Sequence, residues 1–292
     1  MLVQKNVLLA EKTTMKIGGY TNSLFIPESE EELIQTVQEI YNREHHVYIL
    51  SGGSNLLIND NKHFDEIVYM KFACSEMTNL GDGRFYIGAS NRIQKVISYV
   101  NDFGYGGFEG LIGLPTMFGG IIYMNAGLGG ATNPLFTISD FIVNVRAWDM
   151  QEKKLVELDV SQCEFSHRKS IFHANQYVIL GATIHLEKLP PEEVAKAKEE
   201  RLKFCKDNFE YGKGCFGTCF SGATYKILKL VSIMDQILRL GRGRITFGKH
   251  NKNWLVNQGN GKFEDAIRII NMCKLAHRMC LRKIECEVII WE

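Results

Sequence analysis

The spacing of apolar positions predicts extended chain at the start of the sequence and a helix directly after it. Residues 13–27 predict an extended segment that is broken by Gly18 and Gly19. Ser29 begins a predicted helix, because Glu32 lies three residues on and completes a capping box. The apolar face of that helix recurs at helical spacing, at Leu33, Val37, Ile40 and Tyr41. Val47–Leu50 is the next predicted strand, so a strand–helix–strand unit leads into the loop that follows.

Short strands are predicted from about residue 66 to residue 189. One helix interrupts them, near Ile93–Phe103. The strands are predicted at Glu66–Phe72, Phe85–Ile87, Phe141–Asp149, Lys154–Glu157 and Tyr177–Leu186. Pro190 and Pro191 then mark a boundary, because proline cannot continue a strand ladder but suits the first turn of a helix.

Helical patterns dominate the last third of the chain. They are predicted near Glu192–Phe204, Tyr225–Leu240 and Phe263–Arg282, and a closing strand is predicted over Ile284–Trp291. The order of elements indicates an α+β protein with two domains.

Two glycine-rich loops suggest where a ligand binds. The segment from Gly110 to Gly130 reads GLIGLPTMFGGIIYMNAGLGG, and Ser51–Leu57 reads SGGSNLL. Loops of this kind can hold a phosphate or pyrophosphate with backbone amides alone. The alternative is that both are ordinary tight turns, since neither is a P-loop and neither opens a helix with Gly-x-Gly-x-x-Gly.

Composition and charge narrow the class of protein. The chain has 292 residues, 45% hydrophobic and 23% charged, as in soluble globular proteins. Its net charge of +1 gives no global electrostatic case for nucleic acid or membrane as a partner. We expect neither a membrane-spanning segment nor a signal peptide, and therefore a cytoplasmic protein.

The eight cysteines are predicted to be reduced and mostly buried as small apolar residues. The alternative is a zinc site at Cys273, His277 and Cys280, which share one helical face. No Cys-x-x-Cys pair occurs, and we expect no metal.

Six motifs in order resemble the UDP-N-acetylenolpyruvoylglucosamine reductase family, over nearly the whole chain. They are TTMKIGG from Thr13, SGGSNLL from Ser51, GFEGLIGLPTMFGGIIYMNAG from Gly107, HRKSIF from His167, KHNKNWLVNQGN from Lys249, and the terminal IECEVIIW. The overall length resembles the shorter of the family's two types.

The resemblance implies the fold and the cofactor. Residues 1–190 would form an FAD-binding domain of the vanillyl-alcohol-oxidase type, in subdomains of about 1–66 and 67–190, and residues 191–292 a smaller α+β substrate-binding domain. The FAD would be non-covalent, with NADPH as hydride donor. Its implied contacts are Ser51, Gly52, Gly53, Ser54, Asn55, Leu56, Gly113, Gly119, Gly120, Asn125, Ala126 and Gly127.

The family's reaction reduces an enol ether on a UDP-sugar. It needs a cation near the substrate carboxylate, a second group that stabilises charge, and a proton donor. The resemblance assigns these roles to Arg168, Glu287 and Thr218, with His167, His250 and Asn253 on the substrate side.

This chain departs from the family at the proton donor. The family's serine becomes Thr218, and the Lys-Asn/Arg-Pro that follows it there is replaced by Ser221–Ala223. An alternative register makes Cys215 the donor. His167 replaces a tyrosine, and Thr116 replaces a glycine in the flavin loop.

Three functions remain open from the sequence. The first is NADPH-dependent reduction of UDP-N-acetylglucosamine enolpyruvate in peptidoglycan precursor synthesis. The second is a divergent flavoprotein paralogue with another substrate, and the third is a ligand-binding module without catalysis. We expect a monomer or weak oligomer.

Overall fold

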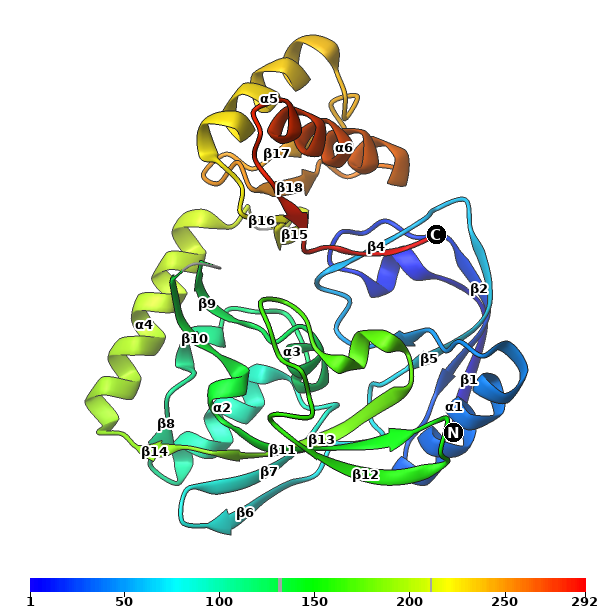
Figure 1. The fold of residues 1–292 in the computed structure, drawn as a ribbon, viewed down its shortest axis with the longest axis vertical. Coiled ribbons are helices and arrows are strands. Elements are labelled where there is room, and N and C mark those ends of the chain that lie inside the picture. The colour runs from blue at the N-terminus through cyan, green and yellow to red at the C-terminus, as the bar shows by residue number, and fades with distance from the viewer. Residues whose placement is uncertain (131–132, 211) are drawn as a thin grey trace. The chain divides into compact units, whose positions relative to one another are not determined.

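The computed structural model describes residues 1–130, 133–210 and 212–292, and it contains two compact units (Figure 1). The larger unit comprises residues 1–5, 23–52 and 66–205, and the smaller unit residues 6–22, 53–65 and 206–292. The units interleave along the chain. The sequence-based boundary at residue 190 therefore stays a prediction.

A five-stranded antiparallel sheet organises the larger unit. Its strand order is β12-β11-β13-β7-β6. These strands are β12 (Lys154–Asp159), β11 (Ile142–Asp149), β13 (Tyr177–His185), β7 (Arg84–Gly88) and β6 (Met77–Gly81). Helices α2 (Ile93–Asp102) and α3 (Phe118–Tyr123) contribute to its core, and α3 packs against β13 and β7.

Four strands of the first third of the chain form a second sheet, in the order β1-β2-β5-β3. They are β1 (Leu2–Leu8), β2 (Tyr20–Ile26), β5 (His63–Tyr69) and β3 (Ile49–Leu50). Helix α1 (Glu30–Glu44) follows β2 and buries Leu33, Val37 and Ile40 in the core of the larger unit. Its predicted cap is partly confirmed, because the Ser29 side chain accepts from the Glu32 amide, whereas the Glu32 carboxylate accepts from Glu28 rather than Ser29.

The remaining ordered elements of the larger unit are short, except for one helix. The two-stranded pairs are β9 (Gly127–Gly130) with β10 (Asn133–Thr137), and β8 (Tyr105–Gly106) with β14 (Glu187–Lys188). Helix α4 (Pro191–Asn208) continues past Cys205, where the larger unit ends. The 3-10 turns lie at Leu9–Lys12 in the smaller unit and, in the larger unit, at Glu109–Leu111, Ile138–Asp140 and Ile171–Ala174.

The smaller unit packs two helices with short strands. Helices α5 (Tyr225–Leu238) and α6 (Phe263–Met279) lie together, and the strand order β15-β18-β17 joins Gly214–Thr218, Trp254–Asn257 and Ile245–Phe247. Further pairs join β16 (Phe220–Ser221) to β19 (Glu285–Cys286) and β20 (Ile289–Trp291) to β4 (Leu56–Ile58). Buried side chains of both helices and of Met15, Ile17 and Leu57 form one core.

Several sequence predictions need correction. The closing strand is two strands, β19 and β20, because each pairs with a different partner and the ladder breaks at Glu287 and Val288. The strand predicted over Val47–Leu50 is only Ile49–Leu50. The glycine-rich segment is not all loop, because it contains α3 and β9.

Candidate functional site

The two glycine-rich loops meet inside the larger unit. A Cβ added at Gly52 would lie 2.9 Å from the Thr116 Cα, so only glycine lets these two backbones approach so closely. A Cβ at Gly120 would lie 3.2 Å from the Thr116 Oγ1 and 3.5 Å from the Ser51 Oγ. Ser51, Thr116 and Gly120 therefore border the same small space.

That space contains an unsatisfied hydroxyl. The Ser51 Oγ is buried and has no hydrogen-bond partner within the described residues. A buried polar atom without a partner costs free energy, which a bound acceptor or donor would recover. The space would accept a phosphate or hydroxyl group of a dinucleotide. Gly120 leaves room for it because it has no Cβ, and the hydroxyls of Ser51 and Thr116 border it.

Other glycines of the long loop are required by the packing of the chain itself. A Cβ at Gly119 would lie 2.9 Å from the Ala89 Cβ, one at Gly127 would lie 2.1 Å from the Phe136 carbonyl oxygen, and one at Gly113 would lie 2.3 Å from the Cys205 Sγ. Their identity is explained without a ligand. Their predicted contacts with FAD, and that of Ala126, stay predictions.

Asn125 connects the long loop to the segment that carries Arg168. It is buried and has a φ of 40°, a conformation that asparagine tolerates better than most residues. Its side-chain amide donates to the Ser166 carbonyl oxygen at 3.1 Å, and its Oδ1 accepts from the Ser139 amide at 3.2 Å. The Asn125 side chain is thus committed to positioning the backbone.

Arg168 lies in a tight turn in the larger unit. Ser166 and Lys169 exchange both backbone hydrogen bonds, and Arg168 has a φ of 56° between them. Its guanidinium donates to the carbonyl oxygens of Asn125 at 3.4 Å and Gly127 at 3.2 Å. The side chain is half-buried, as is that of His167. Arg168 therefore lies at the end of the predicted flavin loop.

The other part of SGGSNLL belongs to the smaller unit, where it contacts the TTMKIGG segment. The Thr14 amide donates to the Gly53 carbonyl oxygen at 3.0 Å, and the Thr14 hydroxyl donates to the Ser54 carbonyl oxygen at 3.2 Å. Gly53 has a φ of 61°, and a Cβ there would lie 2.3 Å from the Lys12 carbonyl oxygen. Two of the six sequence motifs are therefore directly joined.

Hydrogen bonds bring the segments of Thr218 and Glu287 together in the smaller unit. The Glu287 amide donates to the Cys219 carbonyl oxygen at 2.8 Å, and β16 pairs Phe220 with Cys286. The Asn55 side-chain amide donates to the Glu287 carbonyl oxygen at 2.6 Å. Both hydrogen bonds use the backbone of Glu287 and fix the position of the residue without using its carboxylate.

Thr218 and Cys215 differ in their surroundings. Thr218 is exposed, and its Oγ1 accepts from the Trp254 indole N–H at 3.4 Å. The Cys215 Sγ accepts from the Gly217 amide at 3.2 Å, and burial raises the pKa of the thiol. The choice between these two residues as proton donor stays a prediction.

Asn253 holds the segment that directly follows Thr218. Its Oδ1 accepts from the Phe220 amide at 2.9 Å, and its Nδ2 donates to the Phe220 carbonyl oxygen at 2.7 Å. Its own carbonyl oxygen accepts from the Cys219 amide at 2.8 Å. The sequence suggested a substrate contact, and the structure adds a positioning role that sequence spacing could not reveal. His250 is exposed, between β17 and β18.

The cysteine predictions can also be compared with the structure. All eight cysteines are free thiols, and Cys74, Cys163, Cys205, Cys219 and Cys273 are buried, which confirms their apolar role. The His277 ring accepts from the Thr224 amide at 3.0 Å, and its other nitrogen lies 2.8 Å from the Cys273 carbonyl oxygen. Across residues 1–130, 133–210 and 212–292, no group of three or more His, Cys, Asp or Glu residues could hold a metal ion.

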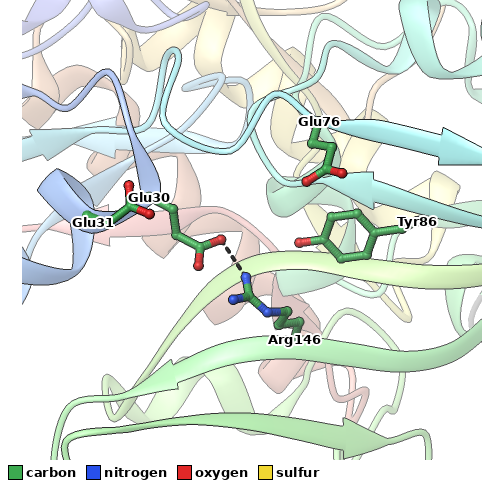
Figure 2. Close-up of a pocket in the computed structure, with 5 residues that line it drawn as sticks. All are labelled: Glu30, Glu31, Glu76, Tyr86 and Arg146. Carbon is green, nitrogen blue, oxygen red and sulfur yellow. Dashed lines mark hydrogen bonds and ion pairs between the residues drawn. The ribbon is translucent and has the colours of Figure 1, made fainter.

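A separate pocket of about 430 Å³ lies on the larger unit (Figure 2). It is lined by Glu30, Glu31, Glu76, Tyr86 and Arg146, and Arg146 donates to Glu30. Three carboxylates disfavour a pyrophosphate. None of the predicted site residues lines this pocket.

Comparisons with known proteins concern the fold and the cofactor. The FAD binding domain family matches residues 22–159, a range that contains Ser51, Thr116 and Gly120. The crystal structure of UDP-N-acetylenolpyruvylglucosamine reductase (MurB) from Thermus caldophilus matches with a TM-score of 0.77 and 22% identity, covering 100% of both chains. The fold is therefore the two-subdomain α+β FAD-binding fold, and the protein is a flavoprotein that binds FAD.

Curated relatives show a similarity that extends beyond the FAD binding domain. A UDP-N-acetylenolpyruvoylglucosamine reductase of Pseudothermotoga lettingae is 29% identical over 96% of this chain and 94% of its own length. A protein of the same name from Fusobacterium nucleatum subsp. nucleatum is 24% identical over 94% of this chain and 93% of its own length. Along almost its whole length, the chain is therefore similar to proteins named UDP-N-acetylenolpyruvoylglucosamine reductase.

Proposed function

We propose that this protein reduces UDP-N-acetylglucosamine enolpyruvate to UDP-N-acetylmuramate, with FAD as cofactor and NADPH as hydride donor. The observation that carries the proposal is the joining of the Thr218 and Glu287 segments through the Cys219 carbonyl oxygen. Relatives that share this name along almost their whole length support the same reaction.

The reaction makes definite demands on the protein. A hydride adds to one carbon of the enolpyruvyl double bond, negative charge builds at the carbon that bears the carboxylate, and a proton adds there. The double bond becomes a single bond, and the substrate gains one hydride and one proton. A cation, a second charge-stabilising group and a proton donor each lower the barrier.

The larger unit would hold the cofactor through Ser51, Thr116 and the open space at Gly120. When bound, FAD supplies the hydride to the substrate and recovers it from NADPH. The Ser51 hydroxyl would gain the hydrogen-bond partner that it lacks among the described residues.

We assign three roles to side chains. Arg168 binds the substrate carboxylate, because its guanidinium fork matches a carboxylate in two hydrogen bonds. Thr218 delivers the proton from its exposed hydroxyl. Glu287 supplies the second group that stabilises the developing charge. Asn55 positions Glu287 by binding its carbonyl oxygen, and Asn253 binds the backbone of Phe220, two residues after Thr218.

The second candidate is a paralogue that acts on another substrate, and the third a binding module that does not catalyse. The replacement of the family's Lys-Asn/Arg-Pro by Ser221–Ala223 motivates both, but the names of the relatives favour neither. We also propose a cytoplasmic location and a monomer or weak oligomer.

Steady-state turnover tests the proposal. Purified protein loaded with FAD is mixed with NADPH and UDP-N-acetylglucosamine enolpyruvate, and the products are identified by mass spectrometry. We expect one UDP-N-acetylmuramate for each NADPH consumed. NADPH consumption without that product would favour the paralogue.

A further inference from the structure

The exposed face of α5 is apolar, although the helix lies at the surface of the smaller unit (yellow in Figure 1). Leu230, Ile233 and Ile237 are 55%, 47% and 74% exposed. They recur at intervals of three and four residues, so they form one stripe along the helix. We call these three residues the α5 stripe.

Two polar residues of α5 lie on its buried face, whereas Lys226, Lys229 and Gln236 are exposed. Ser232 and Asp235 are only 6% and 7% exposed, alongside the buried Leu228 and Val231. An ordinary surface helix buries its apolar face and exposes its polar face. Helix α5 leaves a second apolar face in contact with water, and such a face marks an interaction site.

Cations flank the α5 stripe at both ends. Lys226 and Lys229 precede it, and Arg239 and Arg242 follow it. Residues 222–263 contain eight Lys or Arg and one acidic residue, the buried Asp235. Three of these cations form ion pairs outside the segment, Arg242 and Arg244 with Asp265 and Lys262 with Asp60. Among the residues that the structure describes, Lys226, Lys229 and Arg239 form no ion pair. The whole-chain charge of +1 conceals this local excess.

We propose that α5 docks this protein on the surface of an anionic lipid bilayer. An aliphatic stripe with cations at its ends is the pattern of a helix that lies in the plane of a membrane interface. The aliphatic side chains would enter the acyl boundary while the lysine and arginine side chains reach the headgroup phosphates. This revises the expectation of no membrane partner, which rested on total charge.

The helix lies on the bilayer and does not cross it. With 14 residues, α5 is shorter than the roughly 20 that a spanning helix needs. Of the helices in the described parts of the chain, none is long and apolar enough to span a membrane. The proposal is independent of the enzymatic function.

Flotation with vesicles tests the proposal on the full chain loaded with FAD. The vesicles are equimolar phosphatidylglycerol and phosphatidylcholine, or phosphatidylcholine alone. We expect binding to the anionic vesicles only, and its loss in high salt. Leu230→Gln with Ile237→Gln, and separately Lys226→Gln with Lys229→Gln, should each weaken the partition about tenfold or more.

A matched control distinguishes the effect of the α5 stripe on vesicle binding from the effect of any exposed leucine. Leu155 is 47% exposed on β12 of the larger unit, and Leu155→Gln should leave the partition unchanged. Circular dichroism shows whether each variant is folded. Equal binding to both vesicle types, no binding to either, or an equal loss in the control would overturn the proposal. A variant of the α5 stripe that changes only the oligomeric state, measured by sedimentation, would also overturn the proposal, because the stripe would then be an interface between protein chains.

Discussion

At the scale of residues, Glu287 and Thr218 lie in segments whose backbones are held by other residues. Glu287 is fixed through its amide and its carbonyl oxygen, by Cys219 and Asn55. Thr218 continues into a strand that Asn253 holds on both sides of Phe220. The carboxylate and the hydroxyl can therefore be altered without disturbing the hydrogen bonds that place them.

Glu287→Gln tests the role of the carboxyl group. Glutamine has nearly the same shape and keeps both backbone hydrogen bonds, so we expect unchanged thermal stability and FAD content. The rate of substrate reduction should fall by roughly 10²–10³-fold, because the amide does not replace the carboxyl group in stabilising the developing charge. Single-turnover kinetics measures this rate, and a parental rate would remove Glu287 from the mechanism.

Three variants decide whether Thr218 or Cys215 is the proton donor. Thr218→Val keeps the shape and removes the hydroxyl, so the proton-dependent step should slow by about 10²–10⁴-fold. Thr218→Ser should retain most of the activity. Cys215→Ala should have little effect on rate, because the thiol is engaged by Gly217 and its pKa is raised by burial. The reverse pattern would make Cys215 the donor.

At the scale of elements, local signals in the sequence predicted the helices well. Helix α1 was predicted from the Ser29 cap and the apolar spacing, both of which act within a few residues. Helix α3 was missed because its sequence, FGGIIY, has two glycines, and its packing against β13 and β7 outweighs that weak propensity.

Long-range strand pairing explains the remaining differences between the predicted and the observed elements. The closing strand divides at Glu287 because β19 pairs with β16 and β20 pairs with β4, partners that no local pattern specifies. Family motifs located Arg168, Thr218 and Glu287 as candidates. They could not show that Asn55 and Asn253 use their side chains to hold backbone.

Two neighbouring glycines of α3 should respond differently to alanine. Gly120→Ala places a methyl group beside two side-chain hydroxyls, so the fold should tolerate it while FAD affinity falls about 10–200-fold. Gly119→Ala meets Ala89 instead and should destabilise the fold by about 1–3 kcal/mol. FAD titration and denaturant unfolding measure the two effects. Unchanged FAD affinity in Gly120→Ala would place the cofactor elsewhere.

Asp235 near the end of α5 should make stability depend on pH. Burial raises the pKa of its carboxyl above the ordinary value of 3.8. As pH rises, Asp235 therefore loses its proton in the unfolded chain before it does so in the folded protein. The stabilisation of the folded state that is present below pH 3.8 is lost as pH rises through the higher pKa of the folded state. Asp235→Asn removes this pH-dependent loss of stability, and its side-chain oxygen still accepts a hydrogen bond from the Gly241 amide.

We expect Asp235→Asn to be more stable than the parent at pH 7 and about equally stable at pH 3. Urea unfolding at the two pH values compares them. Equal stability at both would show that burial does not disfavour the charged carboxylate.

At the scale of the whole molecule, the residues assigned to the reaction are divided between the two compact units. Ser51, Thr116, Gly120 and Arg168 belong to the larger unit, while Thr218 and Glu287 belong to the smaller unit. The central claim is that one chain passes a hydride from NADPH to a UDP-sugar through bound FAD.

An anaerobic stopped-flow experiment at the flavin absorption band tests this claim most directly. NADPH is added first and UDP-N-acetylglucosamine enolpyruvate second. We predict that the band bleaches with NADPH and returns with the enolpyruvate. A band that bleaches and does not return would contradict the proposed substrate, and a folded protein that shows no flavin band after addition of FAD would contradict the account as a whole.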